Sequence, residues 1–122
     1  MNNPIIQISW GELFDKITIL QIKLDNLQSE SALRNVRTEY KSLHSIYTKV
    51  FRDDTEANKL LADLKEINQK LWNTEDKIRI KEKGKSFDNE FIELARSVYI
   101  QNDLRSDIKR KINILFRSEL IE

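Results

Sequence analysis

The chain has 122 residues, of which 39% are hydrophobic and 34% charged, and it contains two glycines, one proline and no cysteine. So few helix-breaking residues predict one domain, residues 1–122, built from long helices. The net charge of +1 argues against a nucleic-acid-binding protein, which normally has a strong basic excess, and the lack of cysteine excludes disulfides and thiolate zinc sites.

The start of the chain predicts a short extended arm followed by a capped helix. Residues 4–8 are β-prone and should pack back on the protein or on a partner. Ser9 and Glu12 form a capping box, in which the Ser9 hydroxyl accepts from a backbone N–H and Glu12 reaches back to the cap. The first helix then covers residues 10–27. Its apolar residues extend beyond one stripe, which indicates deep burial or a second partner.

Three further helices are predicted over residues 31–51, 56–82 and about 87–118. Residues 53–56 are an acidic linker that suits a helix start, and Gly84 suits the C′ position that ends the third helix. Short connections between long amphipathic helices predict an all-α fold, an antiparallel bundle of about four helices. Heptad-like spacing favours coiled-coil packing, and helices longer than a monomeric bundle needs favour a homodimer. No segment approaches the roughly 20 apolar residues of a membrane span and no signal peptide is evident, so we expect a cytoplasmic protein.

Polar residues interrupt the apolar stripe of the fourth predicted helix. The candidates for ligand binding there are Arg96, Tyr99, Asn102, Arg105 and Lys109. The last three occupy stripe positions, and buried charge is unfavourable by several kcal/mol unless it is paired or functional. Guanidinium, ammonium, amide and phenol groups match carboxylate, phosphate or sugar hydroxyls. The pattern therefore predicts either an anion-binding patch or a polar end of the bundle that Glu12, Glu75 or Glu82 neutralises.

A second charged group lies in the third predicted helix. Glu75, Asp76 and Arg79 are about one turn apart, and Trp72 precedes them on the side of Arg79. They form either an anion clamp, with the guanidinium stacked on the indole, or an ion pair between helices that fixes their register. Glu75 and Glu82 also interrupt the apolar stripe of this helix.

The remaining polar candidates are two lysines and a possible metal motif. Lys16 and Lys23 flank the stripe of the first helix, where they either complete a cationic wall or extend from the stripe into solvent. His44 is the only histidine, and the single E-x-x-E motif at residues 90–93 has no partner motif for Mg²⁺. We expect neither a metal nor a cofactor.

Three blocks of the chain resemble a small family of bacterial and phage proteins that is known only as a domain of unknown function. They read S-W-G-E-L-x-D-K-I-T-I-L-x-I-K from residue 9, L-W-x-x-E-D-x-I-R from residue 71 and L-A-R-S-V-Y-x-x-N-D-x-R from residue 94. The second predicted helix is not covered. The resemblance implies that the candidates in the three blocks act together, and it associates the chain with gene neighbourhoods for surface polysaccharides and glycosyl transfer.

Three functional hypotheses follow. The first is a binding or adaptor module that recognises a partner protein or an anionic small molecule, such as a phosphosugar or nucleotide-sugar. The second is a metal-free enzyme acting on an anionic substrate, by analogy with the helical chorismate mutases, none of whose motifs can be placed in this chain. The third is a structural homo-oligomer whose ion network lies across the subunit interface. A closed cavity where Arg105, Lys109 and Glu75 converge would favour catalysis, and an open flat face would favour a partner.

Overall fold

The computed structural model describes residues 1–121 and contains four helices, with no strand among those residues. The helices are α1 (Trp10–Asn26), α2 (Glu30–Phe51), α3 (Thr55–Lys83) and α4 (Asn89–Leu115). The all-α prediction is confirmed. Within residues 1–121, every helix is too short or too polar to cross a bilayer.

Each helix begins at a side chain that caps its first turn. Ser9, Ser29, Asp54 and Asp88 accept a hydrogen bond from a backbone N–H three residues later. Because this signal is local, the predicted starts agree closely with the observed ones. The end of α3 differs in detail: Gly84 is the C-cap with a φ of −83°, and Lys85 takes the left-handed conformation with a φ of 53°.

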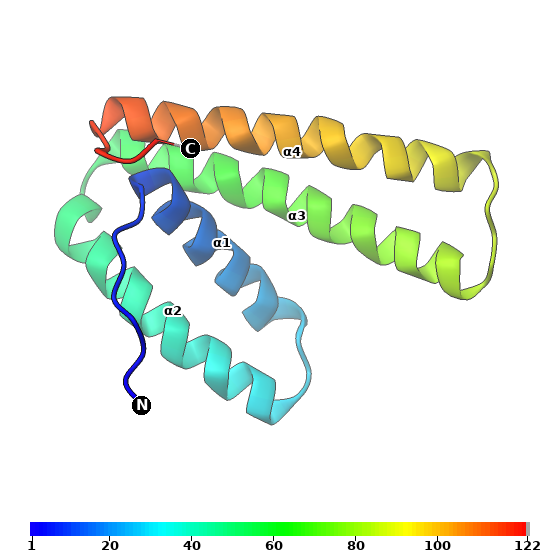
Figure 1. The fold of residues 1–122 in the computed structure, drawn as a ribbon, viewed down its shortest axis with the longest axis horizontal. Coiled ribbons are helices and arrows are strands. Elements are labelled where there is room, and N and C mark those ends of the chain that lie inside the picture. Colours follow the sequence, from blue (N-terminus) through cyan, green and yellow to red (C-terminus); the bar gives the residue numbers. More distant parts are fainter. Residues whose placement is uncertain (122) are drawn as a thin grey trace.

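The helix α1 is the centre of the fold. It packs on α2, α3 and α4, while α3 and α4 form a long hairpin (Figure 1). Phe14 of α1 is fully buried in an aromatic cluster, with its ring centroid 5.1 Å from that of Tyr47 and 5.3 Å from that of Phe51. Burying one such side chain stabilises the fold by about 1.5–3 kcal/mol. The predicted deep burial of the first helix is therefore observed.

The α3–α4 hairpin is longer than the helix that packs on it. With 29 and 27 residues, α3 and α4 extend about 44 and 40 Å, whereas the 17 residues of α1 extend about 25 Å. The hairpin therefore projects beyond the end of α1 (Figure 1). We call residues 76–101, the part that projects, the distal hairpin.

The N-terminal arm packs on the body less than predicted. Residues 1–8 have no regular structure, and only Ile8 contacts the core. Ile5 and Ile6 are 99% and 75% exposed. The arm leads into α1 at the buried Ser9, so only its last residue is close enough to the core to pack there.

Candidate functional site

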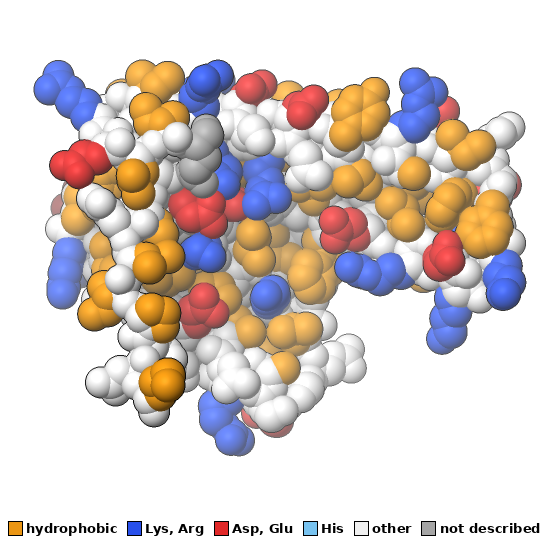
Figure 2. Space-filling model, in the orientation of Figure 1, with side chains coloured by type: hydrophobic (Ala, Val, Ile, Leu, Met, Phe, Trp, Pro, Cys, Tyr) orange, Lys and Arg blue, Asp and Glu red, His pale blue; other side chains and the backbone are white. Residues whose placement is uncertain are grey.

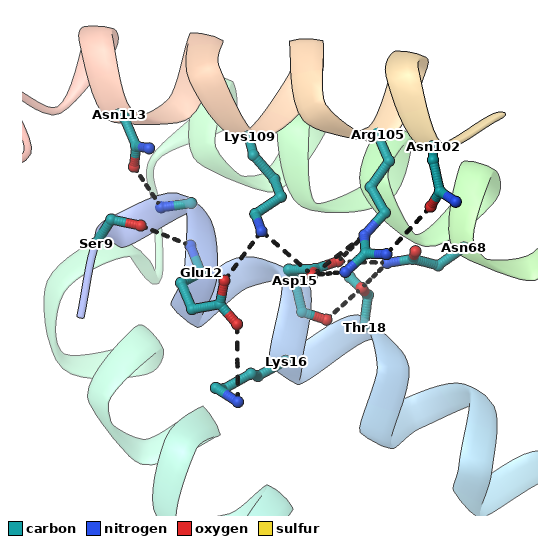
Figure 3. Close-up of polar contacts among 11 residues, drawn as sticks. Ser9, Glu12, Asp15, Lys16, Thr18, Asn68, Asn102, Arg105, Lys109 and Asn113 are labelled. Carbon is teal, nitrogen blue, oxygen red and sulfur yellow. Dashed lines mark hydrogen bonds and ion pairs between the residues drawn. The ribbon is translucent and has the colours of Figure 1, made fainter. Parts of the chain in front are cut away.

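A buried carboxylate on α1 connects three helices. Asp15 is 1% exposed, and Arg105 of α4 donates to it from Nη2 at 2.5 Å and from Nε at 3.1 and 3.2 Å (Figure 3). The Nδ2 of Asn68 on α3 donates to the same carboxylate at 2.8 Å. Breaking a buried ion pair by removing one partner typically destabilises a protein by about 3–5 kcal/mol. The buried charge of Asp15 is therefore stabilised by Arg105 and Asn68, and these hydrogen bonds hold α4 and α3 against α1.

The charge of Arg105 is maintained by this contact. Its hydrogen bonds to Asp15 raise the pKa of Arg105 above its ordinary value, against the opposing effect of burial. The remaining contact of the guanidinium is long, from Nη1 to the Oδ1 of Asn102 at 3.4 Å. Arg105 is thus a permanent cation whose strong hydrogen bonds all go to one carboxylate.

Thr18 completes the connection between α1 and α3. Its hydroxyl is fully buried, donates to the backbone carbonyl of Asp15 at 2.8 Å and accepts from the Nδ2 of Asn68 at 2.8 Å. Every buried polar group here has a partner, which is the condition for a polar group to be tolerated in a core.

A second ion pair lies one turn closer to the start of α1. The Nζ of Lys109 is 2.9 Å from the Oε2 of Glu12 and 3.6 Å from the Oδ2 of Asp15. Lys16 reaches the other oxygen of Glu12 at 3.7 Å, with 44% of its side chain exposed. We call Glu12, Asp15, Lys16, Arg105 and Lys109 the α1–α4 ion network (Figure 3).

The first turn of α1 is fixed against the backbone of α4. The buried Asn113 accepts from the N–H of Gly11 at 2.7 Å. A Cβ at position 11 would lie 2.7 Å from the carbonyl oxygen of Lys109 and 2.9 Å from the Oδ1 of Asn113. Only glycine permits this approach, so Gly11 determines how closely the two halves of the ion network meet.

A cavity of about 200 Å³ opens beside the ion network, where α1 diverges from the hairpin. Four apolar residues and four polar ones line it: Ile19, Ile22, Leu71, Trp72, Asn68, Glu75, Asn102 and Arg105. The face in Figure 2 shows hydrophobic side chains in the hollow between α1 and the hairpin, with charged side chains of both signs around them. The cavity thus combines apolar walls with an equal number of polar residues that can orient a bound molecule.

The structure brings together only part of the predicted α4 patch. Asn102, Arg105 and Lys109 point toward α1 (Figure 3). Arg96 and Tyr99 are exposed on the distal hairpin, with Tyr99 57% exposed, because α1 ends before it reaches them. The structure therefore does not assemble the five residues into one patch.

The charged residues of α3 pair within their own helix. Arg79 lies 3.6 Å from Glu75 and 3.3 Å from Asp76, all with exposed side chains, and within residues 1–121 these three form no ion pair between helices. Glu75 and Glu82 do not interrupt a buried stripe either, since both are exposed. Glu75 lies at the cavity that Ile19 and Ile22 of α1 also line, and Glu82 lies on the distal hairpin. Of these residues only Glu75 lines the cavity.

The lysines of α1 also separate. Lys16 belongs to the ion network, whereas Lys23 is half-buried in the last turn of α1 and does not line the cavity.

The ion network itself lies within one chain. Lys109 is held at Glu12 and Asp15 and does not line the cavity, so the convergence of Arg105, Lys109 and Glu75 that would favour catalysis is not observed.

Three central residues were not among the predicted candidates: Asp15, Thr18 and Asn68. Asp15 and Thr18 lie one turn apart on the helix that the sequence indicates to be deeply buried. A polar residue on such a helix must have a buried partner, and that requirement was the available signal. No group of three or more His, Cys, Asp or Glu side chains in residues 1–121 is arranged to hold a metal ion.

Comparison with known proteins gives one match. A family model described as a family of unknown function, DUF6165, matches residues 5–122. No curated protein and no solved structure matches the chain.

Proposed function

Since the chain belongs to DUF6165, a family of unknown function, we propose a function from its geometry: a binding module that takes a small polar molecule into the cavity beside Arg105. The main support is the unused hydrogen-bonding capacity at the rim. Asp15 and Asn102 engage three of the five N–H groups of the guanidinium, which leaves two for a ligand. The NH₂ group of Asn102 has no partner within residues 1–121.

The cavity is open to solvent, so its volume of about 200 Å³ describes what enters it and not the size of the whole ligand. We propose that one ring with its substituents enters, and that the rest of a larger ligand such as a nucleotide-sugar lies outside the cavity.

Binding is favoured over catalysis by the position of Lys109. A metal-free enzyme of the kind considered above needs several charges directed at one reacting molecule. Here Lys109 is directed at Glu12, away from the cavity lining, and Arg105 is directed at Asp15. The cavity can hold and orient a molecule, but it offers few groups to act on it.

We also propose a homodimer as the oligomeric state. Several apolar side chains of the distal hairpin are about half or more exposed: Ile80, Phe87, Ile92, Tyr99 and Ile100. Within residues 1–121, no third helix packs on this part of the hairpin (Figure 1), and a second copy would supply one. Coiled-coil packing between the copies would suit the heptad spacing of α3 and α4.

The test is a ligand screen with a variant that leaves the ion network intact. The purified protein is screened by ligand-observed NMR against neutral glycosides, sugar phosphates, nucleotide-sugars and dicarboxylates, and hits are titrated by calorimetry. Arg105→Ala is unsuitable, because its loss would also release α1. We expect Asn102→Ala to weaken the binding of a hit by about tenfold, through the loss of one or two hydrogen bonds.

The matched control is Asp103→Ala, which changes the exposed neighbouring residue on α4 and should bind like the wild type. If no compound of the four classes binds the wild type, or if Asn102→Ala binds as tightly as Asp103→Ala, the cavity is not the site.

A further inference from the structure

We infer that the ligand of this cavity is a neutral, polyhydroxylated ring of the size of one sugar, and not an anion. The inference rests on the proposed binding function and specifies its ligand class. It follows from three properties of the lining: its charge balance, its mixture of donors and acceptors, and its apolar walls.

The charge balance of the cavity does not favour an anion. Among the residues that the structure describes, Arg105 is the only cation that lines it, and Glu75 is an anion in the same lining. A carboxylate in the lining repels a phosphate over the same range at which Arg105 attracts it. The repulsion of a phosphate by Glu75 would therefore oppose its attraction to Arg105, and Asp15 behind the guanidinium reduces that attraction further.

The remaining cations do not change this balance. Lys109 is held by Glu12 and Asp15, and Arg79 is 69% exposed and 3.6 Å from Glu75. An exposed pair of this kind is screened by solvent and holds its partners only weakly. Glu75 therefore remains available to a ligand as a hydrogen-bond acceptor and as a negative charge.

The lining contains both donors and acceptors, which suits hydroxyl groups. Arg105 and Asn102 offer N–H donors, while Glu75 offers two acceptor oxygens. A hydroxyl group donates and accepts, so each one can pair with either side of the cavity. Phosphate and carboxylate oxygens only accept, and those facing Glu75 would have no donor, which makes an anion unfavourable there.

The walls of the cavity suit the C–H faces of a ring. Trp72 and Leu71 come from α3, and Ile19 and Ile22 come from α1. An indole presents a large apolar surface at a small loss of conformational freedom. A cyclic polyol has apolar faces and a polar edge, and it therefore matches a cavity with apolar walls and a polar rim.

The experiment uses the opposite response of the two ligand classes to one substitution. Glu75→Gln removes the negative charge and keeps the shape of the side chain. We expect it to weaken a neutral methyl glycoside about tenfold, because a charged acceptor becomes a neutral one. Binding of a sugar phosphate or of inorganic phosphate should become stronger, because the repulsion is gone.

The matched control is Glu66→Gln. Glu66 lies on the same helix and also pairs with a cation four residues later, at 3.7 Å from Lys70, but it does not line this cavity. Its substitution should leave both affinities unchanged. Calorimetric titration of both variants and the wild type with both ligands gives the comparison.

The possible outcomes separate the two proposals. The inference is supported if the protein binds neutral glycosides, and if Glu75→Gln weakens this binding while Glu66→Gln leaves it unchanged. Binding of phosphates or dicarboxylates alone, strengthened by Glu75→Gln, overturns the inference and leaves the binding function standing. If neither class binds the wild-type protein, both proposals are wrong.

Discussion

Gly11 allows two helix backbones to approach more closely than any other residue at that position would. Alanine is usually better than glycine within a helix by about 0.5–1 kcal/mol. Here we expect Gly11→Ala to destabilise the protein by about 1–3 kcal/mol, since its Cβ would lie 2.7 Å from the carbonyl oxygen of Lys109 and α1 would have to shift. Urea unfolding measures the difference in the free energy of unfolding.

Gly84→Ala is the control for this prediction. The nearest atom to a Cβ at that position is 3.6 Å away, and the φ of −83° is open to alanine. We expect no loss of stability in this variant. Equal free energies of unfolding for Gly11→Ala and Gly84→Ala would show that the contact between α1 and α4 is looser than described.

At the same scale, the sequence allowed the cations of the site to be predicted but not their partners. Arg105 and Lys109 stand out because they occupy apolar stripe positions, which is a local pattern. Asp15 lies 90 positions before Arg105, and no periodicity within one helix relates the two. Predicting that pair requires the packing of α1 on α4, which the sequence of neither helix contains.

At the scale of the helices, Tyr47 connects α2 to α3. Its hydroxyl donates to the Oδ1 of Asn58 at 2.6 Å, and the side chain is 4% exposed. Burial, and secondarily the negative charge of Asp54, raise the pKa of Tyr47 to about 12. The folded state therefore holds this proton more tightly than the unfolded state, in which tyrosine titrates near pH 10.

The raised pKa predicts a loss of stability in alkali. The contribution is complete below pH 10 and is lost as the pH rises through about 12. We expect Tyr47→Phe to unfold about 1 kcal/mol more easily at pH 7, through the lost hydrogen bond, and to lose less further stability than the wild type above pH 10. Urea unfolding between pH 7 and 11.5 measures both effects.

Tyr99→Phe is the comparison, because Tyr99 is 57% exposed. We expect the free energy of unfolding of this variant to depend on pH as that of the wild type does. The assignment of the alkaline transition to Tyr47 would be rejected if the two phenylalanine variants lost stability in parallel.

The helix boundaries could be predicted because each one depends on residues that are close together in the sequence. Ser9 and Asp88 cap their helices with their own side chains, and the cap residues are readable from the sequence. The lengths of the helices, in contrast, did not reveal which parts pack together. Glu75 and Glu82 fall on an apolar stripe of α3, but the sequence does not show that this stripe leaves the core near the end of α1.

At the scale of the whole molecule, the structure divides into a well-packed body and the distal hairpin. The body contains the aromatic cluster and the ion network, while the distal hairpin consists of two helices alone. We expect the backbone amides of residues 76–101 to exchange hydrogen through local opening, and those of α1 only through global unfolding. Hydrogen exchange followed by mass spectrometry at low protein concentration measures this difference.

The same measurement tests the homodimer. Raising the protein concentration should slow exchange in the distal hairpin and leave α1 unchanged, because a second copy would cover only the exposed part. Exchange that is independent of concentration, together with a monomeric mass by light scattering, would contradict a homodimer.

Arg105 fixes α1 against α4 and also forms part of the cavity rim. A molecule in which α1 has moved away from α4 therefore has no complete binding site. Only molecules in which α1 is docked on α4 can bind the ligand. Any fraction of molecules with α1 undocked therefore lowers the apparent affinity. Substitutions at Asp15, Gly11 or Asn113 should thus weaken binding without touching the ligand, and a bound ligand should restore the docked state in them.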